Sequence, residues 1–280
     1  MPAVTVLVPT YKHGPTLYES VATALAQTYQ DFEILIVGDG VGDTTRAVVA
    51  DLQRGDQRIR FLDCPKGERR GERNRHEALK EARGEWVCYL ADDDLWFPEH
   101  LSVLVGLLEH ADFAHTLPVK TLTDGSYWVY LCDLGHRYYQ RLLAGNRNLL
   151  PMTCVGHRLD TYWHLPDGWM PEDGTRTSVV LWRQFMSLPD CRFASGMMPT
   201  SLHLASTVRG TTPSQEWLDE LKMWRRRVED SEWRQQMAAE LFNQQMKEFC
   251  AVEAKMRSLW KKQQIAVSGE APRTDQRPPD

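Results

Sequence analysis

The 280-residue sequence lacks any long apolar run, and no stretch approaches the roughly 18 consecutive apolar residues that a membrane-spanning helix requires. Residues 1–6 also lack the basic segment and following apolar run that mark a secretory leader. We therefore expect a soluble cytoplasmic protein with no transmembrane segment, one that can lie at the periphery of the inner membrane.

Cysteine is scarce, and the chain has no excess of positive charge. The six cysteines form no C-x-x-C pair, so the sequence gives no sign of a zinc site or of thiol redox chemistry, and free thiols are expected. The formal net charge is -5. Without a basic footprint, nucleic acid is not an expected partner.

Short β-branched strands alternate with helices through the first hundred residues. The expected strands cover 4–8, 32–37, 59–62 and a segment from Trp86, and the expected helices cover 16–28, 44–52 and 72–82. This alternation predicts an α/β fold with a doubly wound, mainly parallel sheet. Ligands of such sheets bind beyond the carboxyl ends of the strands. Pro9–Tyr11, Asp39 and Asp92–Asp94 should therefore meet in one crevice.

Three consecutive aspartates, Asp92–Asp94, follow the apolar strand that begins at Trp86. Adjacent carboxylates raise each other's pKa, and a divalent cation relieves their repulsion. Oxygen ligands favour a hard ion, so the triplet predicts Mg²⁺ or Mn²⁺. The alternative is an acidic loop that caps the following helix, and the triplet alone does not decide between them.

A glycine-rich turn at 38–43 follows the second strand. It is not a dinucleotide fingerprint, because that pattern follows the first strand and Asp43 stands where its third glycine belongs. Asp43 suits a helix cap. Asp39 is left for another role, and we expect it to meet the polar edge of a base while the glycines allow close backbone approach.

A basic segment at 66–76 opens the third helix and carries five cations: Lys66, Arg69, Arg70, Arg73 and Arg75. Arginines and helix N-termini both bind pyrophosphate, so this segment suits a nucleoside diphosphate. The alternative is a solvated loop whose cations pair with its own glutamates.

Five short motifs stand in one register along the chain: Val-Pro-Thr-Tyr at 8–11, Val-Gly-Asp-Gly at 37–40, Gly-Glu-Arg-Asn at 71–74, Ala-Arg-Gly-Glu-Trp-Val at 82–87 and Ala-Asp-Asp-Asp at 91–94. Together they resemble the family 2 glycosyltransferases with the GT-A fold. The resemblance covers about residues 3–210, most strongly 3–100. It implies an enzyme that takes a sugar from a nucleotide-diphosphate donor held with Mn²⁺ or Mg²⁺.

The resemblance also implies residues for the nucleotide end of the donor site. Asp39 would accept a hydrogen bond from the base N–H, and Arg73 would face the base or the phosphates. Lys66 of the basic segment would bind the donor as well. The nucleoside would be lined by Pro9, Thr10 and Tyr11.

Within the triplet, the resemblance implies that Asp94 binds the metal and Asp93 faces the ribose or the sugar. Asp92 would support the turn in the donor site. The chain departs from the family where Glu72 replaces a small residue and where Lys12 stands in place of a frequent asparagine. Both departures leave the identity of the donor open.

An acidic pair in the second half resembles the motif that supplies the family's catalytic base. A carboxylate can take the proton from an acceptor hydroxyl as its oxygen attacks the anomeric carbon. We predict Asp173 in this role, with Glu172 as the alternative, although the pair could equally open the following helix. His203 stands where many GT-A enzymes place a further metal or phosphate ligand, or is a satisfied core histidine.

The C-terminal segment differs in composition from the rest. Residues 211–262 predict two helices with a break near 230–231, whose apolar stripes would pack on the catalytic domain, a second subunit or a membrane surface. Residues 263–280 predict a disordered tail. The expected organisation is a GT-A domain over 1–210, divided into a nucleotide-sugar half (1–100) and an acceptor half (101–210), with a helical extension.

These features predict a metal-dependent, inverting glycosyltransferase with UDP as the favoured donor nucleotide, because UDP is the commonest in the resembling family. The expected partners are a nucleotide sugar, a carbohydrate or lipid-linked acceptor, and a second copy bound through the C-terminal helices. Two alternatives stay open: a sugar-phosphate nucleotidyltransferase, and a nucleotide-sugar-binding protein without catalysis.

Overall fold

The computed structural model describes residues 1–145, 147–169, 177–204 and 214–268. The chain forms two compact units, Met1–Ser231 and Glu232–Asp280. The first unit is an α/β fold that contains every element of the sheet.

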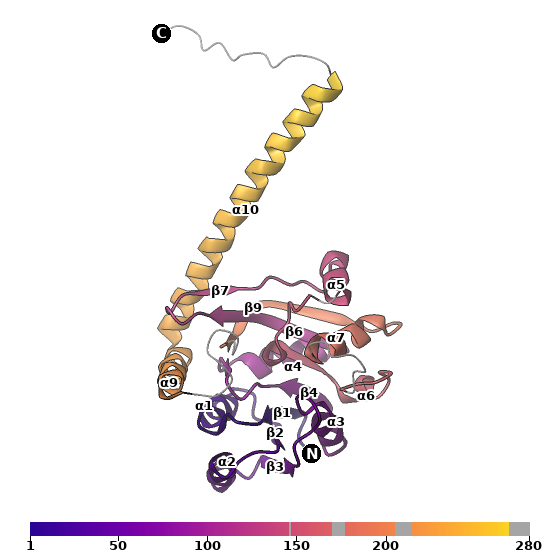
Figure 1. Cartoon of the computed structure of the whole chain (residues 1–280). Coiled ribbons are helices and arrows are strands. Elements are labelled where there is room, and N and C mark those ends of the chain that lie inside the picture. Colours follow the sequence, from indigo (N-terminus) through magenta and orange to yellow (C-terminus); the bar gives the residue numbers. More distant parts are fainter. Residues whose placement is uncertain (146, 170–176, 205–213, 269–280) are drawn as a thin grey trace. The chain divides into compact units, whose positions relative to one another are not determined.

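The N-terminal part of the sheet is a parallel βα arrangement, as the sequence predicts (Figure 1). Strand β1 pairs in parallel with both β2 and β4, and β2 pairs in parallel with β3. The strands are β1 (Val4–Thr10), β2 (Phe32–Asp39), β3 (Ile59–Cys64) and β4 (Trp86–Tyr89), and the helices between them are α1 (Gly14–Leu25), α2 (Asp43–Gly55) and α3 (Glu72–Lys80). Since β1, β2 and β4 are parallel neighbours, their carboxyl ends share one edge.

Side chains of alternating direction build a core on each face of this sheet. Val6 and Ile34 point to one face and pack with α1, α2 and α4 (His100–Leu108). Leu7 and Leu35 point to the other face and pack with α3 and α7 (Thr177–Ser187). A strand that is buried on both faces has a continuous apolar sequence and no alternation of polar and apolar residues. These strands could therefore be recognised from their apolar runs.

The second half extends the sheet with strands of mixed direction. The described strands run in the order β3-β2-β1-β4-β8-β6-β9-β5, with β7 paired to β6. The sequence did not predict β8, a four-residue strand with a glycine, or β9, which contains glycine, proline and two methionines. The remaining elements are β5 (Leu95–Trp96), β6 (Phe113–Thr121), β7 (Tyr127–Val129), α5 (Arg137–Ala144), η1 (Met152–Cys154), β8 (Val155–Arg158), α6 (Leu159–Tyr162) and β9 (Phe193–His203).

Two helices follow in the C-terminal segment, with the predicted break between them. Helix α9 (Gln215–Glu229) belongs to the first unit, where it packs on α1 and its Arg225 forms an ion pair with the buried Glu19. Helix α10 (Ser231–Ser268) makes up the described part of the second unit and continues six residues into the predicted tail. Residues 269–280 lie outside the described residues. Among the described helices, none is long and apolar enough to cross a bilayer.

Three histidines are fully buried in the first unit, namely His100, His115 and His157. Burial lowers their pKa from 6.5 to about 3, about 4 and about 4 respectively, so the folded state keeps them neutral. Between pH 6.5 and about 4 the unfolded chain binds protons at these rings and the folded chain does not. The free energy of unfolding should therefore fall on acidification.

Each of these histidines contributes a slope of roughly 1.4 kcal/mol per pH unit in that window. Urea unfolding at a series of pH values measures the total slope. Substitution of His115 by asparagine should lower this slope by roughly 1.4 kcal/mol per pH unit, which corresponds to one proton fewer bound on unfolding. A free energy of unfolding that stayed constant from pH 6.5 to 4.5 would contradict neutral burial.

Candidate donor-binding site

A pocket of about 370 Å³ lies at the shared carboxyl edge of β1, β2 and β4. The end of β1 supplies its first wall, the end of β2 supplies Asp39, and the loop after β4 supplies Asp92 and Asp93. The sheet therefore brings Pro9–Tyr11, Asp39, Asp92 and Asp93 into one crevice as predicted, whereas Asp94 of the predicted set does not line it. Its lining comprises Pro9, Thr10, Tyr11, Lys12, His13, Val37, Asp39, Arg70, Gly71, Arg75, Ala91, Asp92, Asp93 and Met152.

Asp39 forms one end of the pocket, and its carboxylate is already held by three donors. Its Oδ1 atom accepts from the Gly67 N–H at 2.7 Å and from Asn74 Nδ2 at 2.8 Å, and its Oδ2 atom accepts from Lys66. Lys66 Nζ also lies 4.9 Å from the centroid of the Tyr11 ring. These three donors fix the direction of the Asp39 carboxylate, which leaves its remaining acceptor capacity facing the pocket that it lines.

A glycine is required where the basic segment meets Asp39. Gly71, the N-cap of α3, has φ = 76°, and a Cβ atom there would lie 2.8 Å from the Asp39 Cγ atom. The Gly-Glu-Arg-Asn motif thus has a packing reason for its first residue. Any side chain at Gly71 would displace Asp39 from the pocket.

Arg75 is the buried cation of the pocket. Its side chain is 8% exposed and lies 4.5 Å above the Trp169 ring, with the Glu72 carboxylate 4.0 Å from Nη2. Within the described part of the chain, neither Nε nor Nη2 has a hydrogen-bond partner. Burial lowers the pKa of Arg75, with Glu72 acting against it, but a guanidinium stays charged. A buried guanidinium on a pocket wall, with two nitrogens that form no hydrogen bond within the described residues, is suited to an anionic ligand.

The aspartate triplet divides into two kinds of residue. Asp92 and Asp93 line the pocket, whereas Asp94 is 1% exposed and is not part of the lining. Asp94 accepts hydrogen bonds from the Thr153 hydroxyl and from the Leu204 N–H, and lies 3.0 Å from His203 Nδ1. These bonds join the loop after β4 to η1 and to the end of β9, so Asp94 acts as a cross-link in this structure.

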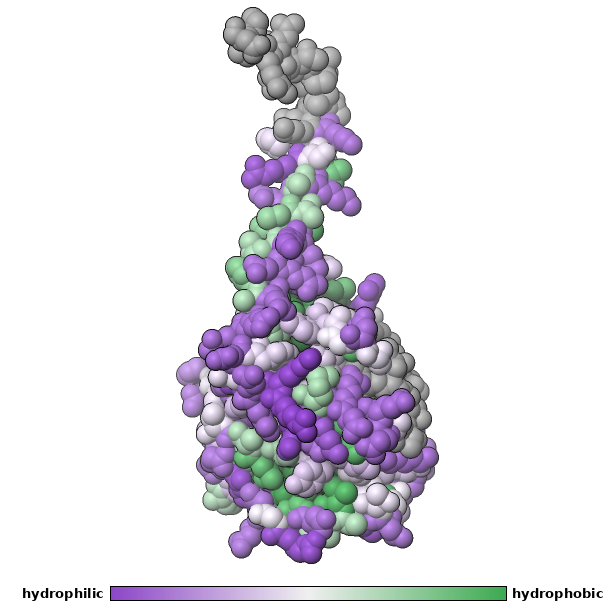
Figure 2. Space-filling model, turned by 90° about the vertical axis from the view of Figure 1, so that its left-hand side faces the viewer, coloured by the Kyte–Doolittle hydropathy of each residue, from purple (hydrophilic) through white to green (hydrophobic). Residues whose placement is uncertain are grey.

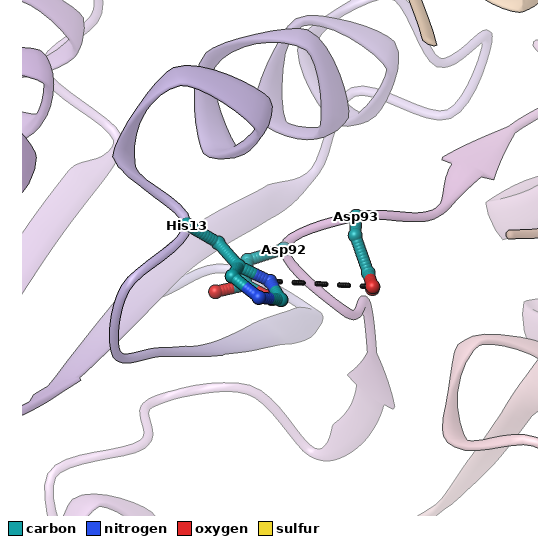
Figure 3. A group of neighbouring side chains, drawn as sticks. All are labelled: His13, Asp92 and Asp93. Carbon is teal, nitrogen blue, oxygen red and sulfur yellow. Dashed lines mark hydrogen bonds and ion pairs between the residues drawn. The ribbon is translucent and has the colours of Figure 1, made fainter. Parts of the chain in front are cut away.

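His13, at the N-cap of α1, completes a cluster with the two pocket aspartates (Figure 3). Its Nδ1 atom lies 2.9 Å from Asp92 Oδ1 and 4.0 Å from Asp93 Oδ2. One ligand atom from each of the three residues can be chosen so that all lie within 4.8 Å of one another. The sequence reading missed His13, although its position two residues after Tyr11 in the loop at the end of β1 was a usable signal.

The electrostatics of this cluster favour a cation. Burial raises the pKa of Asp93 well above its usual range, and Asp94 and Asp92 add to the shift. A divalent ion would offset both effects by stabilising the ionised carboxyl. The donor set, two carboxylates and an imidazole, therefore fits a divalent metal.

His203 is paired with Asp94 and is absent from the pocket lining. Burial acts to lower its pKa, but the Asp94 carboxylate outweighs burial, and the pKa of His203 is raised above its ordinary value. The imidazole is thus held as the ion-pair partner of a buried carboxylate. Its role as a metal ligand stays a prediction.

Two further predicted residues, Arg73 and Lys66, are not part of the pocket lining. Arg73 is exposed on α3, and the arginines of the basic segment that line the pocket are Arg70 and Arg75. The expected contact of Arg73 with the base or the phosphates stays a prediction. Lys66 acts through its bond to Asp39. The predicted bases, Asp173 and Glu172, lie outside the described residues.

Solved structures share this fold. The chain aligns over 87% of its length with 71% of Staphylococcus aureus TarS 1–349, with a TM-score of 0.57 and 17% identity. It aligns over 92% of its length with 80% of a Pyrobaculum calidifontis mannosyltransferase solved with GDP-Man and Mn²⁺, with a TM-score of 0.53 and 16% identity. At these identities the likeness concerns the GT-A fold, which the sequence predicted.

Two curated relatives align with part of the chain. One is a GalNAc(5)-diNAcBac-PP-undecaprenol β-1,3-glucosyltransferase of Campylobacter jejuni, 32% identical over 38% of this chain and 34% of its own length. The other is the Escherichia coli UDP-Glc:α-D-GlcNAc-diphosphoundecaprenol β-1,3-glucosyltransferase WfgD, 34% identical over 38% of this chain and 40% of its own length. The match thus spans only about a third of the length of such relatives.

The model for "Glycosyl transferase family 2" matches residues 5–159. Because that match covers more than half of the chain, this protein belongs to glycosyltransferase family 2.

Proposed function

We propose that the protein is a metal-dependent glycosyltransferase that moves a sugar from a nucleoside-diphosphate donor, with UDP favoured, to the hydroxyl of an acceptor. The observation that carries this proposal is one pocket whose wall includes the Asp39 carboxylate, the buried Arg75 guanidinium and the cluster of His13, Asp92 and Asp93. Asp39, Arg75 and Asp93 all line it. A donor lying along the pocket would place its base at Asp39, its diphosphate at Arg75 and the metal ion at Asp93.

The nucleotide end of the site is built for a base with an N–H group. Asp39 accepts three hydrogen bonds that fix its direction, and Lys66, one of the donors, also lies over the ring of Tyr11. Uracil N3–H and guanine N1–H can both donate to such a carboxylate. UDP is favoured on the family resemblance, and WfgD, by its name, uses UDP-Glc.

The diphosphate end needs positive charge at the moment of reaction. When bound, Mn²⁺ or Mg²⁺ supplies charge stabilisation to the departing nucleoside diphosphate. Asp93 would hold that ion with Asp92 beside it, and Asp94 would fix the loop that carries both. This differs from the sequence prediction, which gave the metal to Asp94, because both Asp94 oxygens accept bonds from inside the fold. Arg75 would bind the phosphate oxygens directly.

We retain Asp173, with Glu172 as the alternative, as the base that takes the acceptor proton. Trp169, four residues before Asp173, is buried against the Arg75 that lines the pocket. The acidic pair thus follows closely in the sequence a tryptophan that packs on a side chain of the pocket wall. Attack of the acceptor oxygen on the anomeric carbon, with departure of the diphosphate on the opposite face, would invert that carbon.

A lipid-linked diphosphate sugar is the acceptor we favour, because both curated relatives are named for diphosphoundecaprenol acceptors. Helix α10 is suited to binding at a membrane surface, because exposed apolar side chains lie along it beside polar ones (Figure 2). Lys255, Arg257 and Lys262 stand on its C-terminal half and suit anionic lipid. The sequence also predicted a homodimer through these helices. Co-sedimentation with anionic vesicles tests the membrane-surface role of α10, and sedimentation velocity tests the homodimer.

A thermal-shift panel tests the proposed donor. UDP-, GDP- and dTDP-sugars are each added with and without Mn²⁺, and a ligand that binds the native state raises Tm. We expect the largest increase for a UDP-sugar with Mn²⁺. No increase with any donor and metal would refute the proposal. A nucleotidyltransferase would instead respond to a nucleoside triphosphate with a sugar phosphate, and a non-catalytic binder would show the shift without ever releasing UDP.

A further inference from the structure

We infer that His13 is a direct nitrogen ligand of the metal, so that this site is a mixed nitrogen and oxygen site and not a carboxylate-only one. The inference rests on the proposed function, which supplies the metal. Its basis is the contact between the N-cap of α1 and the loop after β4, two segments separated by 79 positions in the sequence. His13 and Asp92 also line the same pocket.

The distances permit shared coordination. Ligand atoms bound to one ion at about 2.1 Å lie about 3.0 Å apart when adjacent and about 4.2 Å apart when opposite. His13 Nδ1 is 2.9 Å from Asp92 Oδ1 and 4.0 Å from Asp93 Oδ2. The imidazole thus stands next to one carboxylate and nearly opposite the other, and coordination requires only small shifts of the side chains.

The direction of the His13 ring is fixed by its neighbours. Trp217 of α9 packs edge-on against it, with ring centroids 5.3 Å apart and an interplanar angle of 72°. Trp217 is 3% exposed, and α9 is held on α1 through the pair of Arg225 with Glu19. The imidazole is therefore presented to the aspartates on a rigid support, which a loosely held surface histidine would lack.

The Nδ1 atom can carry a proton or bind a metal, but not both. A protonated His13 would simply form an ion pair with Asp92, whereas a neutral ring can donate its lone pair to the ion. Only coordination by the neutral ring would change which metal the site prefers. Imidazole favours later transition metals, while oxygen ligands and water suit Mg²⁺. With His13 as a ligand, the ratio of Co²⁺ or Mn²⁺ affinity to Mg²⁺ affinity should be raised.

Pulsed EPR of the full chain with Mn²⁺ and UDP tests the ligand directly. An imidazole nitrogen bound to Mn²⁺ modulates the electron spin echo at nitrogen frequencies, and labelling with ¹⁵N-histidine changes those frequencies. We expect histidine modulation in the wild type, its loss in His13→Asn, and its retention in His203→Asn. Loss in His203→Asn with retention in His13→Asn would overturn the assignment in favour of His203.

Metal titrations give a second readout that does not depend on turnover. His13→Asn should weaken Mn²⁺ and Co²⁺ binding at least about tenfold while changing Mg²⁺ binding much less. A wild type that binds Mn²⁺ with no histidine modulation would overturn the inference and leave the proposed function standing. A wild type with UDP but no Mn²⁺ binding would instead refute the metal dependence itself.

Discussion

Replacing Asp93 by asparagine is expected to lower kcat roughly a thousandfold while leaving the fold intact. Asp93 lines the pocket, and its buried carboxyl stands beside two other aspartates. The amide keeps the shape but loses the negative charge that would hold the ion, so stabilisation of the leaving diphosphate is lost. Removal of one carboxylate from a repelling trio should also leave thermal stability in the absence of metal unchanged or raised.

Release of UDP from the donor, with Tm in parallel, measures both effects of Asp93→Asn. Asp43→Asn is the matched control, because Asp43 opens α2 and its side chain is fully exposed. Asp94→Asn should behave differently from Asp93→Asn by lowering Tm, since it weakens the bonds to Thr153 and Leu204. Full activity in Asp93→Asn would exclude this residue from the metal site.

Replacing Arg75 by methionine, in a chain that also carries Glu72→Gln so that no buried carboxylate loses its counter-charge, should weaken donor binding roughly a hundredfold and raise the stability of the free protein. The guanidinium is buried, and two of its nitrogens form no hydrogen bond among the described residues, a desolvation that costs about 1–3 kcal/mol. Methionine has similar length, can keep the contact with the Trp169 ring and carries no charge to desolvate. The charge-assisted bonds to phosphate, about 1.5–3 kcal/mol each, are lost.

The opposite changes in stability and in binding separate a ligand-binding role from a structural one. Chemical unfolding measures the first, and titration with UDP measures the second. Arg73→Met is the matched control, because Arg73 lies two positions away on the exposed face of α3. If Arg75 instead served the fold, Arg75→Met would lower the free energy of unfolding and leave UDP affinity nearly unchanged.

The sequence predicted the N-terminal half well, because its strands are continuous apolar runs with helices between them. β1, β2 and β4 are parallel neighbours, and that arrangement alone brings Asp39 and Asp92 to one edge. β8 and β9 escaped prediction, since Gly156 and Gly196 interrupt their apolar pattern and their pairing is set by distant segments. Local sequence cannot specify such pairing.

The site was predicted by region more reliably than by residue. The basic segment was identified, but which arginine of α3 lines the pocket depends on the rotation of that helix. Arg75 lines the pocket together with Arg70 of the preceding loop, whereas Arg73 does not. Within the triplet, the burial of Asp94 depends on Thr153 and Leu204, which lie 59 and 110 positions away. His13 could be identified as part of the site only from its contact with Asp92, which is 79 positions away in the sequence.

Isothermal titration of the full chain with UDP, and with GDP in parallel, tests the central claim most directly. Each titration is made once in Mn²⁺ and once in EDTA. The pocket that joins Asp39, Arg75 and Asp93 predicts that at least one nucleoside diphosphate binds with Mn²⁺, that EDTA weakens this binding more than tenfold, and that Asp93→Asn removes the difference. Equal affinity in Mn²⁺ and EDTA, or no binding of either nucleotide, would contradict a metal-assisted donor site.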